Sequence, residues 1–224
     1  MIVSRLNDIL IEASRSLDRT QDYRCPSCDE AVVLKAGVKK IAHFAHKVNS
    51  DCQHGVGETQ WHLAAKSNLA KYLRAEGFEV ELEKPLGNRR ADLFASHPTK
   101  GTKVYEMQRK CIGREIYNRT SDLLRYCDTV TWVLPWDAKP MEGGFRVTAT
   151  YMINALLSDT KSPRKTNVRF FDHKENVVYR CNRRPWQLYK EETYNDYTGE
   201  SYGGYFYTSK RWCALDPIQT WELT

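Results

Sequence analysis

The pattern of apolar and polar residues divides the first 135 residues into a short series of predicted elements. Apolar positions recur at helical spacing up to about residue 76, and Gly77 is a typical stop signal. In chain order the predicted elements are a helix led in by Gly57-Glu58-Thr59, strands at 78–82, 90–95 and 103–108, a helix at 113–126 and a strand at 129–134. This order predicts an α/β fold.

The flanking segments give weaker patterns. Residues 1–20 place Leu6, Ile9, Leu10 and Ala13 at helical spacing, which favours a short amphipathic helix and leaves a strand as the alternative. The remaining predictions are a hairpin of 31–35 with 39–44 around Gly37, a helical turn at 152–157, a loop at 158–167 and a hairpin of 168–171 with 176–179. We therefore expect three parts, namely an N-terminal segment 1–54, a core 55–138 and a β-rich, aromatic-rich extension 139–224.

Composition narrows the setting without identifying a partner. Hydrophobic residues make up 41% of the 224 residues, which is enough for a packed core. No run approaches the roughly 20 apolar residues of a membrane span, and the first residues carry charges too early for an export signal. We expect a cytoplasmic protein with no membrane partner. The net charge of +6 permits an anionic partner such as nucleic acid but does not require one.

Cysteine and histidine residues near the N-terminus follow a pattern typical of zinc sites. A Cys-x-x-Cys turn presents two thiolates together, and a hairpin after it returns further ligands to the same ion. The predicted ligands of this structural zinc are Cys25, Cys28, His46 and Cys52. His43 is an alternative fourth ligand and His54 a weaker one. Four filled positions leave no room for substrate, so the metal is expected to stabilise folding or docking.

Two predicted strands bring acidic side chains to one part of the sheet. Asp92 lies at the start of strand 90–95, and Glu106, Met107 and Gln108 lie on the next strand. Because side chains alternate along a strand, Glu106 and Gln108 share a face while Met107 points into the core. Oxygen ligands of this kind suit Mg²⁺ or Mn²⁺, which can activate water and stabilise charge on a phosphate. The pattern predicts such a metal at Asp92 and Glu106.

The first predicted helix adds polar side chains on one face. Glu58, His62 and Lys66 are spaced four residues apart, so they project in the same direction. They can point toward a metal or a phosphate, and the alternative is a solvent-exposed face with ordinary ion pairs. Glu83, just after strand 78–82, is either a supporting carboxylate or a plain exposed acid.

These motifs together resemble the competence protein CoiA family. The matching motifs are Cys-Pro-x-Cys, His-Phe-Ala-His, Gly-Glu-Thr-x-x-His, Arg-Arg-Ala-Asp, Glu-x-Gln, Asn118-Arg119-Thr120 and Thr131-Trp132-Val133-Leu134, and they cover residues 23–134. The resemblance implies a zinc-finger-like segment followed by a nuclease domain of the PD-(D/E)XK (restriction-endonuclease-like) type. It implies catalytic roles for Glu58, Asp92, Glu106 and Gln108. In that superfamily a lysine commonly stands where Gln108 does, and Lys66 or Lys110 is the candidate substitute.

Basic and aromatic side chains near the predicted site suit a phosphodiester backbone. The predicted substrate-binding residues are His62, Lys66, Arg90, Arg119 and Tyr126. Beyond the core, the tyrosine-rich run 202–207 is as consistent with a protein or homo-oligomer interface as with a simple extension of the fold.

The sequence therefore predicts a divalent-metal-dependent nuclease that hydrolyses phosphodiester bonds in single- or double-stranded DNA, in DNA processing, recombination or defence. The alternative is a non-catalytic DNA-binding module or a scaffold of a recombination or anti-phage system, because Gln108 replaces the usual lysine. Clustered carboxylates favour the enzyme, since a protein that only binds DNA has no need of acidic groups beside phosphate.

Overall fold

The computed structural model describes most of residues 1–136 and shorter stretches after them. The described residues are 1–47, 50–52, 54–55, 57–109, 113–136, 139–141, 144–146, 166–172, 174, 177–181, 193–194, 201–202 and 215–220. The predicted helical turn at 152–157, most of the loop at 158–167 and most of the aromatic run 202–207 lie outside these residues.

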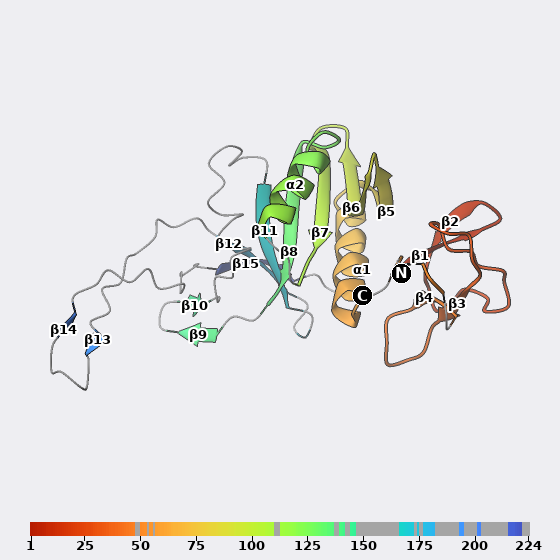
Figure 1. Ribbon diagram of the computed structural model, residues 1–224, viewed down its shortest axis with the longest axis horizontal. Coiled ribbons are helices and arrows are strands. Elements are labelled where there is room, and N and C mark those ends of the chain that lie inside the picture. The colour runs from red at the N-terminus through yellow and green to blue at the C-terminus, as the bar shows by residue number, and fades with distance from the viewer. Residues whose placement is uncertain are drawn as a thin grey trace.

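A seven-stranded sheet forms the centre of the molecule (Figure 1). Its spatial order is β15 (Leu215–Thr220), β12 (Val177–Cys181), β11 (Thr166–Asp172), β8 (Thr129–Pro135), β7 (Gly101–Met107), β6 (Arg89–His97) and β5 (Glu79–Leu86). Strands β5, β6 and β7 pair antiparallel through short turns, whereas β8 runs parallel to β7. Helix α2 (Gly113–Leu123) provides the crossover that a parallel pair needs.

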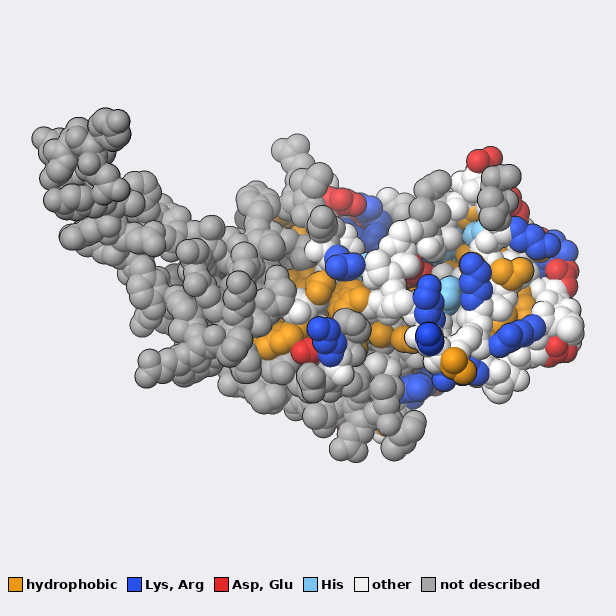
Figure 2. Space-filling view, turned by 90° about the horizontal axis from the view of Figure 1, so that it is seen from below, with side chains coloured by type: hydrophobic (Ala, Val, Ile, Leu, Met, Phe, Trp, Pro, Cys, Tyr) orange, Lys and Arg blue, Asp and Glu red, His pale blue; other side chains and the backbone are white. Residues whose placement is uncertain are grey.

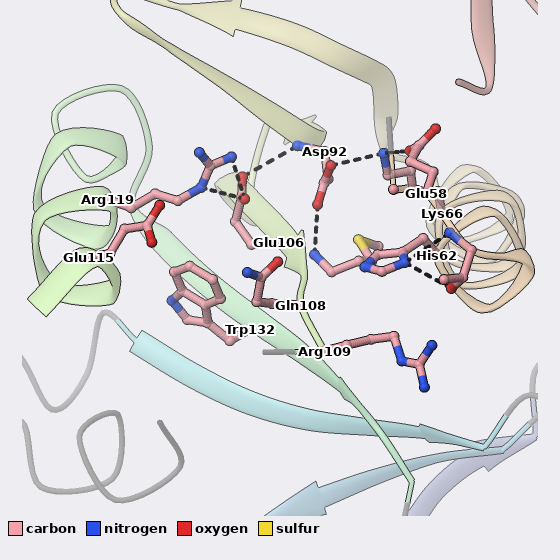
Figure 3. Close-up of a pocket in the computed structure, with 13 residues that line it drawn as sticks. Glu58, His62, Lys66, Asp92, Glu106, Gln108, Arg109, Glu115, Arg119 and Trp132 are labelled. Atoms are coloured by element: carbon pink, nitrogen blue, oxygen red, sulfur yellow. Dashed lines mark hydrogen bonds and ion pairs between the residues drawn. The ribbon is translucent and has the colours of Figure 1, made fainter. Parts of the chain in front are cut away.

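The two helices cover opposite faces of this sheet. Helix α1 (Gln60–Ala75) packs on the face that carries Met107 and Val133, and α2 packs on the face that carries Val104 and Trp132. Successive residues of one strand therefore contribute to two separate cores. The N-terminal ends of both helices lie near the ends of β6 and β7, where the polar residues predicted from the sequence are found (Figure 3).

The observed order of α1, β5, β6, β7, α2 and β8 confirms the predicted order of helix, three strands, helix and strand. The hairpin predicted at 168–179 is also confirmed, because β11 and β12 pair antiparallel with Phe171 opposite Val178. Strand β11 also pairs parallel with β8. Residues beyond 138 therefore extend the central sheet itself.

Two small hairpins form the N-terminal unit at one end of the molecule (Figure 1). They are β1 (Val3–Leu6) with β2 (Ile9–Glu12), and β3 (Val32–Lys35) with β4 (His43–His46). The helix predicted within residues 1–20 is wrong. Asn7 and Asp8 have φ of 49° and 63°, the left-handed conformations of a two-residue hairpin turn.

The second hairpin lies within residues 25–52, which we call the knuckle. Its predicted first strand is confirmed, but its second strand begins at His43 rather than at residue 39. Phe44 on this strand is fully buried and packs against Tyr23, with ring centroids 4.9 Å apart. These rings belong to a core of their own, so the knuckle has a packed interior besides any bound metal.

Two further strand pairs complete the described structure, β9 (Lys139–Met141) with β10 (Gly144–Arg146) and β13 (Thr193–Tyr194) with β14 (Ser201–Tyr202). Among the helices that the structure describes, none is both long and apolar enough to cross a bilayer.

The turn between β5 and β6 depends on a glycine. Gly87 has φ of 59°, and a Cβ at this position would lie 2.2 Å from the Tyr126 hydroxyl oxygen. We expect Gly87→Ala to lower the free energy of unfolding by about 1–3 kcal/mol, because a strained backbone adds to the clash. Chemical denaturation measures this loss. A Tyr126→Ala background should reduce it, and an equal loss in both backgrounds would contradict the contact with Tyr126.

Candidate active site and metal site

A cavity of about 540 Å³ opens between the N-terminal end of α1, the ends of β6 and β7, and α2. The residues predicted from the sequence that line it are Glu58, His62, Lys66, Asp92, Glu106, Gln108 and Arg119, and Figure 3 shows them facing a common space. The structure therefore brings together side chains from positions 58 to 119 of the chain.

Asp92 and Glu106 lie side by side where β6 and β7 separate. The ladder between these strands begins at Leu93 opposite Tyr105. Beyond this pair the carboxylates replace backbone bonds: Asp92 Oδ2 accepts from the Met107 amide at 2.8 Å, and Glu106 Oε1 accepts from the Asp92 amide at 3.3 Å. Each oxygen keeps lone-pair capacity for a further partner.

Glu106 is 2% exposed, and its carboxyl group interacts with the charge of Asp92. Burial, and next the charge of Asp92, raise the pKa of Glu106 to about 8, although Arg119 Nε opposes this shift from 2.7 Å. A cation beside Asp92 and Glu106 would offset the repulsion between them and restore the charge of Glu106. The oxygen donors present thus fit a hard divalent ion.

Lys66 is a buried ammonium group in contact with three carboxylates. Its Nζ lies 2.5 Å from Glu58 Oε1 and 2.9 Å from Asp92 Oδ1, and it also contacts Glu83 Oε1. Burial acts to lower the pKa of Lys66, but Asp92, Glu83 and Glu58 together raise it well above its ordinary value. Lys66 is therefore charged at any physiological pH. The α-amino nitrogen of Met1 is a second cation on Glu58, at 2.7 Å.

Glu83 is the site residue that the sequence left undecided. Leu82 packs on the α1 side of the sheet and Leu86 on the α2 side, so the alternation of side chains reverses between them. The reversal coincides with Glu83, whose φ of 55° is rare for a residue other than glycine. This conformation turns the Glu83 carboxylate inward. Burial acts to raise the pKa of Glu83, but His54 and Lys66 outweigh this effect and lower it to about 2.

His62 is oriented by the start of α1. Its Nδ1 accepts a hydrogen bond from the backbone amide of Thr59, the N-cap residue, at 3.3 Å. Burial lowers the pKa of His62, although the charge of Asp92 opposes the shift. The ring is therefore neutral near pH 7 and carries its proton on Nε2, which makes Nε2 a hydrogen-bond donor.

Two residues predicted to bind substrate do not line the cavity. Arg90 Nε lies 3.2 Å from Glu83 Oε2, and Arg90 Nη1 donates to the Ser27 hydroxyl, so its guanidinium group is held by protein partners. Tyr126 lies beyond the end of α2, which stops at Leu123, and its hydroxyl faces the turn at Gly87. Lys110, a candidate to replace the strand lysine, lies outside the described residues.

The knuckle contains a compact group of metal-binding side chains. The ligand atoms of Cys25, Cys28, His46 and Cys52 all lie within 4.8 Å of one another, and no second such group occurs among the described residues. This set matches the predicted zinc ligands and includes His46 rather than His43, whose Nδ1 lies 2.8 Å from the Ile41 carbonyl oxygen. Three thiolates and one imidazole could hold a structural metal such as zinc.

The comparisons with known proteins agree with this architecture. Residues 58–198 match the family described as competence protein CoiA, nuclease-like domain, which places the sheet and its cavity in a nuclease-like class. Residues 6–55 match the family described as competence protein CoiA, N-terminal domain. The chain belongs to the competence protein CoiA family, which confirms the resemblance noted from its motifs.

Two similar proteins extend this comparison. Competence protein CoiA of Bacillus subtilis (strain 168) is 34% identical over 76 residues, which cover 33% of this chain and 20% of that protein. The match thus spans about a fifth of the curated relative. A solved structure of a Silicibacter pomeroyi protein of unknown function shares 19% identity, with a TM-score of 0.31 over 49% of this chain and 62% of that one.

The metal group of the knuckle leads to a direct test. We expect Cys28→Ala and His46→Ala to reduce bound zinc from about one ion per chain to far less, since each removes one of four ligands. Elemental analysis of gently purified protein measures this. Cys127→Ala, which removes a buried thiol of the main core, and His43→Ala should keep their zinc. Zinc loss in His43→Ala would show that the wrong histidine is assigned.

The raised pKa of Glu106 predicts how stability depends on pH. Between about pH 5 and 8 the folded protein keeps a proton that the unfolded chain has lost, so the free energy of unfolding should fall as the pH rises. Glu106→Gln should remove this part of the slope in protein without added divalent ions. Urea denaturation across that range measures it, with the exposed Glu81→Gln as control. An unchanged slope in Glu106→Gln would exclude the raised pKa.

Proposed function

We propose that this protein is a nuclease that hydrolyses phosphodiester bonds in DNA with Mg²⁺ or Mn²⁺, through a site of the PD-(D/E)XK type, and that it acts in the cytoplasm. One observation carries the proposal. Asp92 and the fully buried Glu106 adjoin in an open cavity, and burial and the charge of Asp92 raise the pKa of Glu106 to about 8 although Arg119 is its ion-pair partner. Such a pair is suited to a divalent cation and has no evident use in a protein that only binds DNA.

Asp92 and Glu106 would hold the cation. When bound, it would supply positive charge to the phosphate and make water a better nucleophile. The protein's own groups do the rest. The peptide amide of Met107 and the guanidinium of Arg119 hold the two carboxylates in place, so the ligands are fixed before substrate arrives.

Lys66 is the proposed replacement for the strand lysine. Gln108 can donate and accept hydrogen bonds but carries no charge, so it can orient water or the phosphate without offsetting negative charge. Lys66 supplies that charge from α1, since its ammonium already touches Asp92 at 2.9 Å. Glu58 and Glu83 hold the ammonium at that point, which makes them supporting residues of the site.

Side chains around the rim suit an anionic substrate. Arg109 and the Nε2–H of His62 line the same cavity as donors. On the knuckle, Lys35, Lys39, Lys40 and Lys47 are exposed, and Figure 2 shows Lys and Arg side chains along the described part of one face. Phosphate groups on either side of the scissile bond would find positive charge there.

A DNA-binding module without catalysis is the second candidate, favoured by the uncharged Gln108. Cleavage assays decide between the two. We expect the wild type to cleave single- or double-stranded DNA when Mg²⁺ or Mn²⁺ is present, and Asp92→Asn or Glu106→Gln to lower the rate by about 100-fold or more. These changes keep side-chain shape and remove a metal-binding charge.

Controls make the result specific. Glu81→Gln removes an exposed carboxylate of β5 outside the cavity, and it should cleave at the wild-type rate. Equal cleavage by the wild type, Asp92→Asn and Glu106→Gln would refute the site. DNA binding by all of them with no cleavage in either metal would support the binding module instead.

A further inference from the structure

Glu83 is the point where the knuckle meets the cavity. On the sheet side it contacts the ammonium of Lys66, which in turn contacts Asp92. On the other side two cationic or polar groups, both in contact with residues of the knuckle, reach its second oxygen, Oε2. These are the imidazole of His54 at 3.6 Å and the guanidinium of Arg90 at 3.2 Å.

His54 connects a metal-binding thiol to this carboxylate. Its Nδ1 lies 3.4 Å from Cys25 Sγ, while Nε2 lies 3.6 Å from Glu83 Oε2. The His54 side chain is 2% exposed, so water has little access to either nitrogen. His54 is not one of the four compact ligands, and it stands behind the ligand Cys25 as a supporting group.

Arg90 forms a second connection. Its Nη1 donates to the Ser27 hydroxyl at 3.2 Å, and Ser27 lies between the two cysteines of the Cys-x-x-Cys turn. The backbone amide of Ser27 in turn donates to Cys25 Sγ at 3.4 Å. Both routes from Glu83 therefore end at the same turn, which a bound metal would hold in one conformation.

We propose that metal binding in the knuckle sets the position of Glu83, and through it of Lys66, with His54 and Arg90 as the positioning residues. Coordination would fix Cys25 and the turn after it. His54 and Arg90 would then hold Glu83 in its left-handed conformation, which persists only where the surroundings determine it. The catalytic consequence rests on the proposed nuclease function, but the coupling itself does not.

Two substitutions of His54 test its contacts with Cys25 and with Glu83 separately. The amide nitrogen of asparagine stands near the place of the histidine Nδ1, and that of glutamine near the place of Nε2. His54→Asn should therefore keep the contact with Cys25 and lose the one with Glu83. His54→Gln should do the reverse. His97→Asn, a change of the same type at the far end of β6, is the matched control.

Hydrogen–deuterium exchange of residues 81–94, with zinc content measured in parallel, tests the link without any need for catalysis. In the wild type, removing zinc with a chelator should speed exchange in this segment about tenfold while β8 stays protected. His54→Asn should keep its zinc and still exchange fast there. His54→Gln should bind zinc more weakly, and its segment 81–94 should respond less to zinc removal. His97→Asn should behave as the wild type.

The coupling is refuted by any of three results. The first is a wild-type exchange rate in zinc-loaded His54→Asn. The second is equal acceleration of exchange in β8 on zinc removal, which indicates global unfolding. The third is loss of zinc from His54→Asn, which makes His54 a ligand. The Mn²⁺ concentration for half-maximal cleavage should rise in His54→Asn. If the wild type shows the expected exchange pattern but cleaves no DNA, the proposed function is refuted and the coupling stands.

Discussion

The burial of the Lys66 ammonium is the constraint on which the rest of the site depends. A charge taken out of water is tolerated only where opposite charges meet it in fixed positions. Here the opposite charges come from three different segments, the lead-in to α1, strand β5 and strand β6. The helix can therefore pack on the sheet only in a position that lets Glu58, Glu83 and Asp92 converge on one nitrogen.

Two glutamates of this site show how position decides the behaviour of one residue type. Glu83 has cations on both of its oxygens, and its pKa falls to about 2. Glu106 has one guanidinium partner but also faces Asp92, and its pKa rises to about 8. Pairs of carboxyl groups whose surroundings separate their pKa values are typical of acid–base and metal chemistry. Glu83 is an anion that holds Lys66, whereas Glu106 would gain its charge if a cation bound beside it.

Much of the fold could be predicted from the sequence because periodicity reports burial directly. The order from α1 to β8 followed from helical and strand spacing, and the Cys-x-x-Cys turn with His46 and Cys52 followed from ligand spacing. The hairpin at residues 3–12 was missed because helical spacing of a few apolar residues outweighed the turn residues Asn7 and Asp8, whose left-handed conformations reverse the chain.

The parts of the site that could not be predicted depend on tertiary contacts. Strict alternation along β5 would put Glu81 and Glu83 on one face, and only the backbone reversal at Glu83 turns the second inward. The partners of Arg90 also depend on tertiary packing. Its place beside Asp92 suggested contact with substrate, but the packing of the knuckle against β6 gives it Glu83 and Ser27 as partners.

The left-handed conformation of Glu83 implies a trade-off between stability and function. Glycine adopts that conformation without strain, but it would also remove a counter-charge of the buried Lys66, so relief of strain and loss of ion pairing oppose each other. Without the Glu83 carboxylate, Lys66 would lose one of its three ion-pair partners, and the cavity would lose its connection to the metal-binding group of the knuckle. A glycine at position 83 would thus relax the backbone and leave a less well-defined site.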